Sequence, residues 1–215
     1  GGTVTLLAGH YNITGSITLA SNISLVGQGV GTVLKIPNNY NKNLDVIYAT
    51  LVNHVIVADL KIDGNKANQT AGSMNGIYFD TVTSSTIEGC WIENMTNVGI
   101  QGNSSSSITI TNNTANNNVN IGIVLSGSSY NTTITNNTAN SNSSVGIWLS
   151  DSSSNNITDN TANYNNSFGF YLDGSSGNTI TNNTANSNYQ YDGFTLIRSS
   201  GNTITNNTAD NNIRS

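Results

Sequence analysis

The sequence predicts an all-β, single-domain right-handed parallel β-helix, a solenoid with three short strands per rung, about 23 residues per rung and about eight to nine rungs. The first observation is a Gly followed by Ile or Phe, which recurs about 23 residues apart along the chain, at Gly76, Gly99, Gly122, Gly146, Gly169 and Gly193. The second is that each repeat holds three short alternating segments separated by turn residues. The third is that no segment has the length of a helix. Such a rung cannot bury its inner face alone, so it stacks on its neighbours.

Residues 1–75 are predicted to form the irregular N-terminal rungs of this β-helix. They contain apolar segments of strand length, separated by polar turns. Longer loops are expected at Lys42–Asn43 and Gly64–Ser73. The predicted strands of this part are Ile17–Leu19, Ile23–Leu25, Val33–Ile36, Val46–Tyr48 and Val55–Ile62.

Residues 76–215 are predicted to form six regular rungs of about 23 residues each. In the first strand of a rung, Val145, Ile147 and Leu149 are expected on one side and Trp148 on the other. Stacking places like residues above one another, about 4.8 Å apart. Two interior columns are therefore predicted: Ile87, Ile110, Ile134, Ile157, Ile180 and Ile204; and Ile92, Ala115, Ala139, Ala162, Ala185 and Ala209.

An asparagine recurs once per rung, as the second residue of an Asn-Asn or Asp-Asn pair. Asn tolerates the left-handed conformation at a bend, and its amide can bond up and down a stack. We interpret this column as a structural asparagine ladder, with Cys90 as a small buried residue one rung earlier. The ladder residues are Asn113, Asn137, Asn160, Asn183 and Asn207.

Two parts of the sequence resemble known families. The segment Thr3-Val4-Thr5-Leu6-Leu7-Ala8-Gly9-His10-Tyr11, followed by Leu25-Val26-Gly27-Gln28-Gly29, resembles the entry of pectate-lyase-like β-helices. The Asn-Thr-Ile-Thr-Asn-Asn units with Gly-Ile-x-Leu resemble the NosD-like and carbohydrate-binding/sugar-hydrolase repeats, as in archaeal surface proteins. The resemblance implies the fold over nearly the whole chain. It leaves function open, because this scaffold carries lyases, hydrolases, epimerases, adhesins and structural proteins.

Composition excludes several classes of function. The net charge is −5 and the few cations are scattered, so no nucleic-acid surface is expected. No apolar run approaches membrane-spanning length. One cysteine cannot form an internal disulfide. The chain opens without a signal peptide and is interpreted as a mature or trimmed product that works outside the cytoplasm, extracellular or at the cell surface.

A first candidate for chemistry lies at the end of the first strand of three consecutive rungs. Counted from the repeat Gly, Asp151, Asp173 and Arg198 take similar places there. They are weak catalytic candidates, and the alternative is that they are solvated turn charges. Three aromatic residues are candidates for stacking on a sugar ring: Trp148, Tyr171 and Tyr78.

Cofactor and metal requirements are expected to be absent. Calcium is expected only if the protein is a lyase, since Ca²⁺ needs clustered oxygen ligands. The NosD-like resemblance suggests copper binding, and copper sites favour His, Met and Cys ligands. The chain has two His, two Met and one Cys without a shared spacing, so no copper site is predicted.

Asn-x-Ser/Thr acceptors are frequent, and several follow automatically from the repeat. One group would form a line along the solenoid, and whether it faces outward is open from sequence. The glycosylation candidates are Asn112, Asn136, Asn182, Asn206, Asn131, Asn142, Asn165, Asn68 and Asn94.

Paired threonines form two further columns, for which ice binding is a minor alternative to ordinary exposed strand residues. They are Thr109/Thr111, Thr133/Thr135, Thr179/Thr181 and Thr203/Thr205, with Asn156 interrupting one column.

The function expected first is a non-enzymatic, self-assembling surface-layer, sheath or filament component that is N-glycosylated. Open terminal rungs favour self-association, because exposed strand edges pair with other chains. The alternative is a carbohydrate-binding or polysaccharide-cleaving β-helix, either a lyase or a glycoside hydrolase, that uses the face of the first strand.

Overall fold

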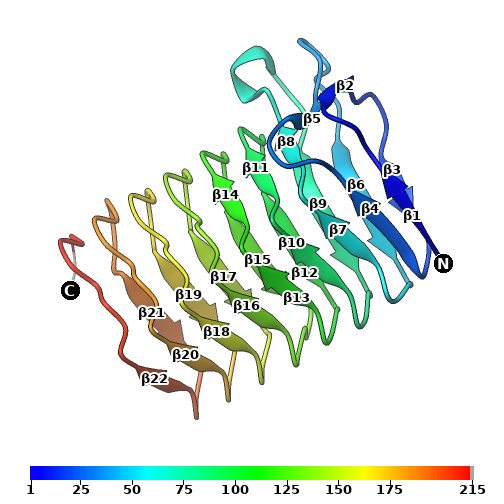
Figure 1. The fold of residues 1–215 in the computed structure, drawn as a ribbon. Coiled ribbons are helices and arrows are strands. Elements are labelled where there is room, and N and C mark those ends of the chain that lie inside the picture. The colour runs from blue at the N-terminus through cyan, green and yellow to red at the C-terminus, as the bar shows by residue number, and fades with distance from the viewer. Residues whose placement is uncertain (214–215) are drawn as a thin grey trace.

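The chain winds into a right-handed parallel β-helix of about eight turns, as the repeat predicts. The computed structural model describes residues 1–213, and its strands form three parallel sheets that run along one axis (Figure 1). We call them sheets A, B and C. Each rung passes from C to A to B, and the chain then enters the next rung.

The bounds of the strands follow the predicted segments closely. Sheet A contains β1 (Gly2–Thr5), β4 (Ile23–Val26), β7 (Ile56–Ala58), β10 (Thr86–Glu88), β13 (Thr109–Thr111), β16 (Thr133–Thr135), β18 (Asn156–Thr158), β20 (Thr179–Thr181) and β22 (Thr203–Thr205). Sheet B contains β2 (Gly9–Asn12), β5 (Thr32–Lys35), β8 (Lys61–Asp63), β11 (Trp91–Glu93) and β14 (Thr114–Asn116). Sheet C contains β3 (Ile17–Leu19), β6 (Leu44–Thr50), β9 (Met74–Asp80), β12 (Ile100–Asn103), β15 (Ile123–Ser126), β17 (Ile147–Ser150), β19 (Phe170–Asp173) and β21 (Phe194–Ile197).

Two details refine the irregular N-terminal rungs. The segment Val55–Ile62 is not one strand but two, because Asp59 has a left-handed backbone (φ 51°) that turns the chain from sheet A into sheet B. The expected loop Gly64–Ser73 contains a short 3-10 helix, η1 (Lys66–Asn68).

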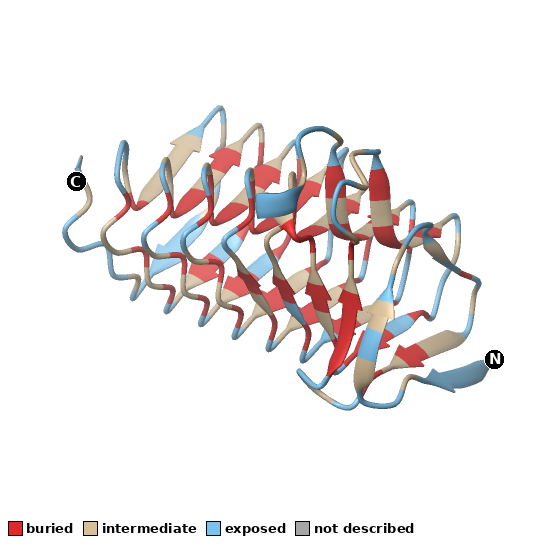
Figure 2. Cartoon of the chain, turned by 90° about the horizontal axis from the view of Figure 1, so that it is seen from above, coloured by how far each residue is buried: buried red, intermediate tan, exposed pale blue. Residues whose placement is uncertain are grey.

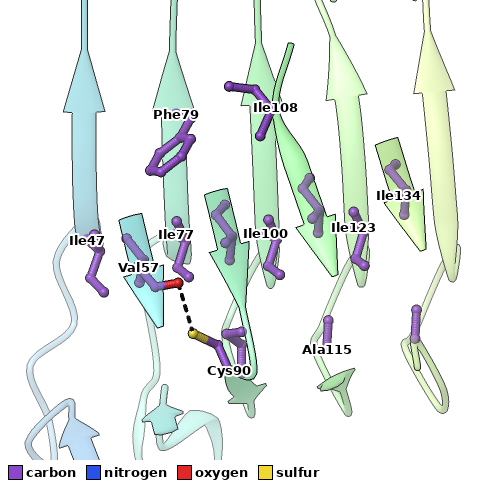
Figure 3. Close-up of a cluster of buried hydrophobic side chains, with 14 of the residues drawn as sticks. Ile47, Val57, Ile77, Phe79, Cys90, Ile100, Ile108, Ala115, Ile123 and Ile134 are labelled. Atoms are coloured by element: carbon purple, nitrogen blue, oxygen red, sulfur yellow. Dashed lines mark hydrogen bonds between the residues drawn. The ribbon is translucent and has the colours of Figure 1, made fainter. Parts of the chain in front are cut away.

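The interior is a set of stacked columns, as predicted. Ile110 pairs with Ile87 on one side and Ile134 on the other, and Ile157 and Ile180 continue the column. The second column is equally regular, since Ala115, Ala139, Ala162 and Ala185 are all fully buried. Burial alternates along most strands of the inner rungs (Figure 2), and inward side chains of successive strands lie side by side (Figure 3). The fold is therefore held by apolar contacts between neighbouring rungs.

The predicted asparagine ladder is present at the corner between sheets A and B. Asn137 donates from its backbone N and its Nδ2 to Oδ1 of Asn160, at 2.9 and 3.0 Å, and from Nδ2 to the carbonyl of Ile110 at 2.8 Å. Cys90 donates its backbone N to Asn113 at 2.9 Å and so occupies the same column. The left-handed residue is the preceding one, not the ladder residue: φ is 55° at Asn112 and 54° at Asn136.

The structure contains further buried amide files that sequence analysis did not identify. One lies between sheets B and C, where each backbone N bonds to the Oδ1 of the next rung: Asn118, Asn142, Asn165, Asn188 and Asn212. Another lies between sheets C and A, at Asn155, Asn178 and Asn202. These files satisfy the buried backbone groups at the corners of the coil.

The asparagine file between sheets B and C, which we call the second asparagine file, explains why the repeat residue is Gly. A Cβ added to Gly146 would lie 2.6 Å from the Cβ of Ala162 and 2.7 Å from Nδ2 of Asn165. Because Gly146 occupies an inward position, Val145 turns outward and packs in a second apolar cluster with Trp148, instead of lying inward with Ile147 and Leu149. The prediction for Val145 was therefore wrong.

Candidate functional site

The outward face of sheet C carries an aromatic file along the axis. Register pairs Tyr48 with Tyr78, and Trp148 with Tyr171. Gln101 and Val124 continue the same column between these two pairs. The stacking candidates Tyr78, Trp148 and Tyr171 thus share one file. Tyr48 extends it and was missed, although it stands at the outward position of the predicted strand Val46–Tyr48.

One end of the file is a cluster of four neighbouring aromatic rings, which we call the aromatic platform. Phe168 stacks on Tyr171 at 4.9 Å between ring centroids and on Tyr191 at 4.7 Å, and Trp148 lies 5.7 Å from Tyr171. A small apolar cluster supports it from the neighbouring rungs, formed by Val98, Ile121, Val124 and Val145. Half-exposed aromatic rings that are supported by buried apolar side chains on a rigid sheet are typical of a ligand-binding site.

The other end of the file is a polar groove beside β6 and β9. The groove has a volume of about 330 Å³, and Asp45, Asn75 and Tyr78 lie in its wall. Burial raises the pKa of Asp45, and the hydrogen bond from Asn75 at 2.7 Å opposes this without cancelling it. Burial also raises the pKa of Tyr78, and the nearby carboxylates of Asp80 and Asp45 add to the effect. Perturbed titratable groups that share a groove mark a candidate reaction centre.

Two outward polar chains run along sheet C and end on carboxylates. Asn120 donates to Asn97, Asn97 donates to Asn75, and Asn75 donates to Asp45, each through Nδ2. In the second chain, Asn103 donates to Asp80 at 2.8 Å. These bonds fix the two carboxylates in position relative to Tyr78, as preorganised sites require.

Asp45 and Asp80 do not form the carboxylate pair of a glycoside hydrolase. Asp45 pairs with Asn75, and Asp80 lies five residues further along the same strand. At about 3.3 Å per residue this separates the two positions by roughly 16 Å. Hydrolysis needs the two groups about 5–9.5 Å apart across one bond. The two carboxylates therefore face different parts of any ligand that lies on this sheet.

The predicted group of Asp151, Asp173 and Arg198 comes together at the far end of sheet C. Arg198 donates from Nε and Nη2 to Oδ1 of Asp173 at 2.9 and 2.7 Å and bonds Oδ2 at 2.7 Å. The pKa of Arg198 is raised, first by this hydrogen bond and then by the charges of Asp173 and Asp151. Asp173 pairs with Ser150 and Ile197, so Asp151 and Arg198 each lie one residue beyond its register. Asp173 is thus neutralised by Arg198.

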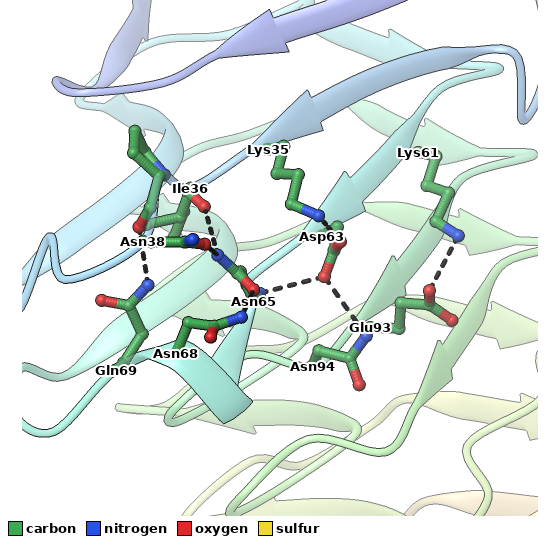
Figure 4. A network of polar contacts seen from close by, with 11 residues as sticks. Lys35, Ile36, Asn38, Lys61, Asp63, Asn65, Asn68, Gln69, Glu93 and Asn94 are labelled. Atoms are coloured by element: carbon green, nitrogen blue, oxygen red, sulfur yellow. Dashed lines mark hydrogen bonds and ion pairs between the residues drawn. The ribbon is translucent and has the colours of Figure 1, made fainter.

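Sheet B carries a second cluster of charge (Figure 4). Lys35 binds Asp63 at 3.3 Å, and Lys61 binds Glu93 at 2.7 Å. Burial acts to raise the pKa of Asp63, but the bonds from Asn65, Asn94 and Lys35 outweigh it and lower the pKa. Trp91 donates its Nε1 to Glu93 at 2.7 Å. Each charge of this cluster has its partner within it, so its role is to hold the rungs together.

The soft metal ligands do not form a copper site. Met74, Met95 and Cys90 point into the core and are at most 2% exposed. Burial raises the pKa of the Cys90 thiol to about 12, which keeps it protonated. His10 and His54 are exposed, in β2 and in the turn before β7. Within residues 1–213, no three His, Cys, Asp or Glu side chains are grouped to hold a metal ion.

The glycosylation candidates divide into accessible and buried residues. Asn112, Asn136, Asn182 and Asn206 are exposed at the left-handed corners and do form a line along the solenoid. Asn131 and Asn68 are exposed and Asn94 is half-buried. Asn142 and Asn165 are corrected here: they are 1% and 0% exposed, inside the second asparagine file. They cannot accept a glycan in the folded chain. Use of the exposed acceptors stays a prediction.

The threonine columns lie on the outward face of sheet A. Thr109 pairs with Thr133, and Asn156 takes the next place before Thr179. The other column is uninterrupted, with Thr181 and Thr205 bonded at 3.0 Å. Ice binding by these columns stays a prediction. Among the described residues no helix is long and apolar enough to span a membrane.

Relatives of known activity match part of the chain. The mannuronan C5-epimerase AlgE2 of Azotobacter vinelandii is 33% identical over 90 residues, which cover 36% of this chain and 9% of that protein. AlgE1 of the same organism is 34% identical over 91 residues, which cover 35% of this chain and 6% of AlgE1. The chain thus spans about a tenth or less of the length of these relatives.

Similar solved structures share the fold over most of the chain. The catalytic domain of a GH87 α-1,3-glucanase, in complex with tetrasaccharides, has a TM-score of 0.76 at 22% identity and covers 94% of this chain and 40% of its own. The A-module of the Azotobacter vinelandii mannuronan C-5 epimerase AlgE6 has a TM-score of 0.71 at 19% identity, covering 99% and 68%. The periplasmic alginate epimerase AlgG has a TM-score of 0.66 at 14% identity, and the match covers 89% of this chain and 51% of AlgG.

The expectation of a non-enzymatic surface-layer, sheath or filament protein is contradicted by these comparisons. The relatives and solved structures named above are, by their names, enzymes that modify polysaccharides. They favour the alternative, a carbohydrate-active β-helix.

The profile of one family matches residues 12–215, nearly the whole chain, and its description is periplasmic copper-binding protein (NosD). The ligands of this chain do not fit copper, as shown above, so family membership is not extended to that metal. The expected resemblance to NosD-like repeats is confirmed. The chain belongs to the NosD family of right-handed parallel β-helix proteins.

Proposed function

We propose that this protein is a carbohydrate-active β-helix that binds a polysaccharide chain along the outward face of sheet C and modifies it. The observation that carries the proposal is the aromatic file, which ends in a groove that holds two titratable groups with raised pKa. Sugar rings present C–H faces that pack on aromatic side chains, and hydroxyl groups that bond to amides and carboxylates.

The dimensions of the file suit a linear polymer. From Tyr48 to Tyr171 the file spans six rungs, which are separated by five steps. At about 4.8 Å per rung this is about 24 Å. Because the strands are rigid, the contacts are prearranged and little side-chain entropy is lost on binding. A chain of several sugar units would contact the platform and the groove together.

The groove supports proton transfer. A carboxyl group whose pKa is raised retains a proton to higher pH, which suits a general acid, and its conjugate base is a stronger proton acceptor. We assign this role to Asp45, with Tyr78 beside it. The carbohydrate-modifying enzymes among the relatives support the assignment to this reaction class.

We further propose that the protein works outside the cytoplasm. The family description names a periplasmic protein, and the structural neighbour AlgG is a periplasmic enzyme. Fractionation of the native source, with immunodetection of the chain, tests this. Recovery in the cytoplasmic fraction alone would contradict it.

The two tryptophans provide a test of the binding face. Trp148 lies in the sheet C file and Trp91 on sheet B. In Trp91→Phe the remaining indole reports sheet C, and in Trp148→Phe it reports sheet B. We expect soluble polysaccharide to change the fluorescence of Trp91→Phe and not that of Trp148→Phe. A change in Trp148→Phe alone would overturn the proposed face.

Variants then separate binding from reaction. We expect Tyr171→Ala to weaken binding about tenfold or more, while Trp91→Ala, the matched control on sheet B, leaves it unchanged. Asp45→Asn and Tyr78→Phe should bind but lose turnover, measured by reducing ends and by the NMR spectrum of the polymer. Absence of binding to every member of a broad polysaccharide panel would refute the proposal.

A further inference from the structure

Carboxylates lie along the side of the molecule that carries sheet C, which holds five of the eleven in the chain. Its strands and their immediate flanks hold five carboxylates: Asp45, Asp80, Asp151, Asp173 and Asp192. Asp45 lies in the wall of the groove, Asp80 lies at the far end of β9, and Asp173 ends β19, two residues after Tyr171 of the aromatic platform. Any ligand that lies along the file therefore passes several carboxylates.

Two cations lie near this face, and the guanidinium of Arg198 is the one held in an ion pair. Arg198 forms a bidentate pair with Asp173. Lys42, two residues before β6, lies over the ring of Tyr40 at 5.9 Å. In the described part of the chain the other basic side chains lie elsewhere: Lys35 and Lys61 are paired on sheet B, and Lys66 of η1 bonds the carbonyl of Asn117. The described face thus offers an acidic sugar no unpaired guanidinium.

This distribution of charge selects between classes of polysaccharide. A polyuronate carries a carboxylate on every sugar unit, and proteins recognise carboxylates with Arg or Lys, best in bidentate geometry. Like charges opposed across an interface oppose binding. A neutral sugar carries no such penalty, because its hydroxyl groups can donate to carboxylates such as Asp45 and Asp80 while its apolar faces stack on the aromatic file.

We infer that the polysaccharide bound along sheet C is uncharged. The inference rests on the proposed function and narrows its substrate class. An uncharged ligand would distinguish this chain from the relatives that match part of it, which are named for mannuronan, a polyuronate. The inference does not depend on which neutral sugar is bound. A neutral polymer has no sugar carboxylate, so lyase or epimerase reactions next to such a group do not suit this groove. Cleavage or transfer of a glycosidic bond between neutral sugars suits it better.

The direct test compares binding of matched polymers to the purified chain. One matched pair is polygalacturonate and its fully methyl-esterified form, which differ in charge on the same backbone. Mannuronan and a set of neutral glucans and mannans complete the panel. We expect at least one neutral polymer to bind, with affinity nearly independent of salt between about 0.05 and 0.5 M, because no counterions are displaced. Each polyuronate should bind about tenfold more weakly or worse.

The outcomes are distinguishable. Tighter binding of polyuronates than of every neutral polymer overturns the inference and leaves the proposed function standing. Binding to none of the polymers refutes the proposed function itself.

A charge variant provides a second readout. Asp173→Asn releases Arg198 and removes one carboxylate, so the ratio of polyuronate to neutral affinity should rise several-fold at low salt. The matched control is Asp159→Asn, on the corner between sheets A and B. It removes the same charge away from sheet C and should leave the ratio unchanged. Equal changes in the two variants would contradict a local effect of charge on this face.

Discussion

At the residue scale, single asparagine side chains form the hydrogen bonds that stabilise the corners of this solenoid. Asn160 accepts from the backbone N and the Nδ2 of Asn137, and its own Nδ2 donates to Ile134 and Thr158 carbonyls and to Asn183. The side chain thus satisfies buried groups of three rungs at once. Such a network is favourable only when complete, since a buried polar group without a partner costs about 1–3 kcal/mol.

We therefore expect Asn160→Ala to lower the free energy of unfolding by roughly 2–5 kcal/mol, because it orphans the buried N–H of Asn137 and leaves a cavity. Chemical denaturation followed by circular dichroism measures this. The control is Asn112→Ala, at an exposed corner, which should cost less than Asn160→Ala. A loss below about 1 kcal/mol for Asn160→Ala would contradict the structural role of the ladder.

Asp45 illustrates the cost of a functional group. Its pKa is raised by burial, so between the unfolded value of 3.8 and the higher folded value the folded state holds more protons than the unfolded state. Stability then falls as pH rises through that window, and below it the penalty vanishes. The half-buried carboxylate is still screened by water, which keeps the effect small.

We expect Asp45→Asn to be more stable than the wild type at pH 7 by less than about 1 kcal/mol, and equally stable near pH 3. The substituted amide can still accept the bond from Asn75. Thermal unfolding across this range of pH measures the difference. A variant that is less stable at pH 7 would show that the carboxylate stabilises the fold, and would remove the reason for a functional role.

At the scale of elements, neighbouring rungs approach so closely that the residue just before β15, β17 and β19 must be Gly. Gly122, Gly146 and Gly169 would each place a Cβ within 2.8 Å of the carbonyl oxygen of the repeat glycine in the next rung, and as close to an Ala Cβ later in the same rung. Their backbone angles are not among the left-handed ones, so the constraint is space and not conformation.

We expect Gly146→Ala to destabilise the chain by about 1–3 kcal/mol through overpacking. Gly15→Ala is the matched control, because a Cβ there has no heavy atom within 4 Å. Denaturant unfolding of the two variants under one condition measures the contrast. Equal stabilities would mean that the rungs can move apart at no cost.

At the scale of the whole molecule, each rung contacts only its neighbours. Stability of such an array is a sum of rung and interface contributions, so an end rung is held by one interface and an inner rung by two. The central column residue Ile157 is 1% exposed, whereas Ile204 of the last described rung is 46% exposed.

In hydrogen exchange of the full chain, we expect the amides of β16 and β18 to exchange at least about 100-fold more slowly than those of β22. Mass spectrometry of peptides from each rung measures this. Uniform protection along the axis would indicate a single cooperative unit instead. Self-association through the terminal rungs also stays a prediction, which analytical ultracentrifugation tests.

Particular residues show how far sequence reasoning reaches. Ile134 and Ala139 were placed correctly because the regular repeat period maps directly onto one turn of the coil. Val145 was misplaced because Gly146 interrupts the alternation from which its side was inferred. Asn142 and Asn165 were misread because the sequon rule considers a single tripeptide and ignores the rung above.

The groove was missed for a related reason. Tyr48 and Tyr78 lie further apart in the chain than one regular period, so no repeat aligned them. The carboxylate of Asp45 meets Tyr78 only through the pairing of β6 with β9. The group of Asp151, Asp173 and Arg198 was found because the regular rungs could be counted, although Asp151 and Arg198 each lie one residue beyond the register of Asp173.

The sequence by itself determined the coil, its period, its buried columns and its asparagine ladder, because these depend on side chains that meet their own counterparts one turn away. Only the tertiary structure decided which asparagines are buried, which aromatic residues share an outward file, and which carboxylates are free or paired. Those properties depend on insertions, corners and neighbouring faces, where residues unrelated by the repeat come into contact.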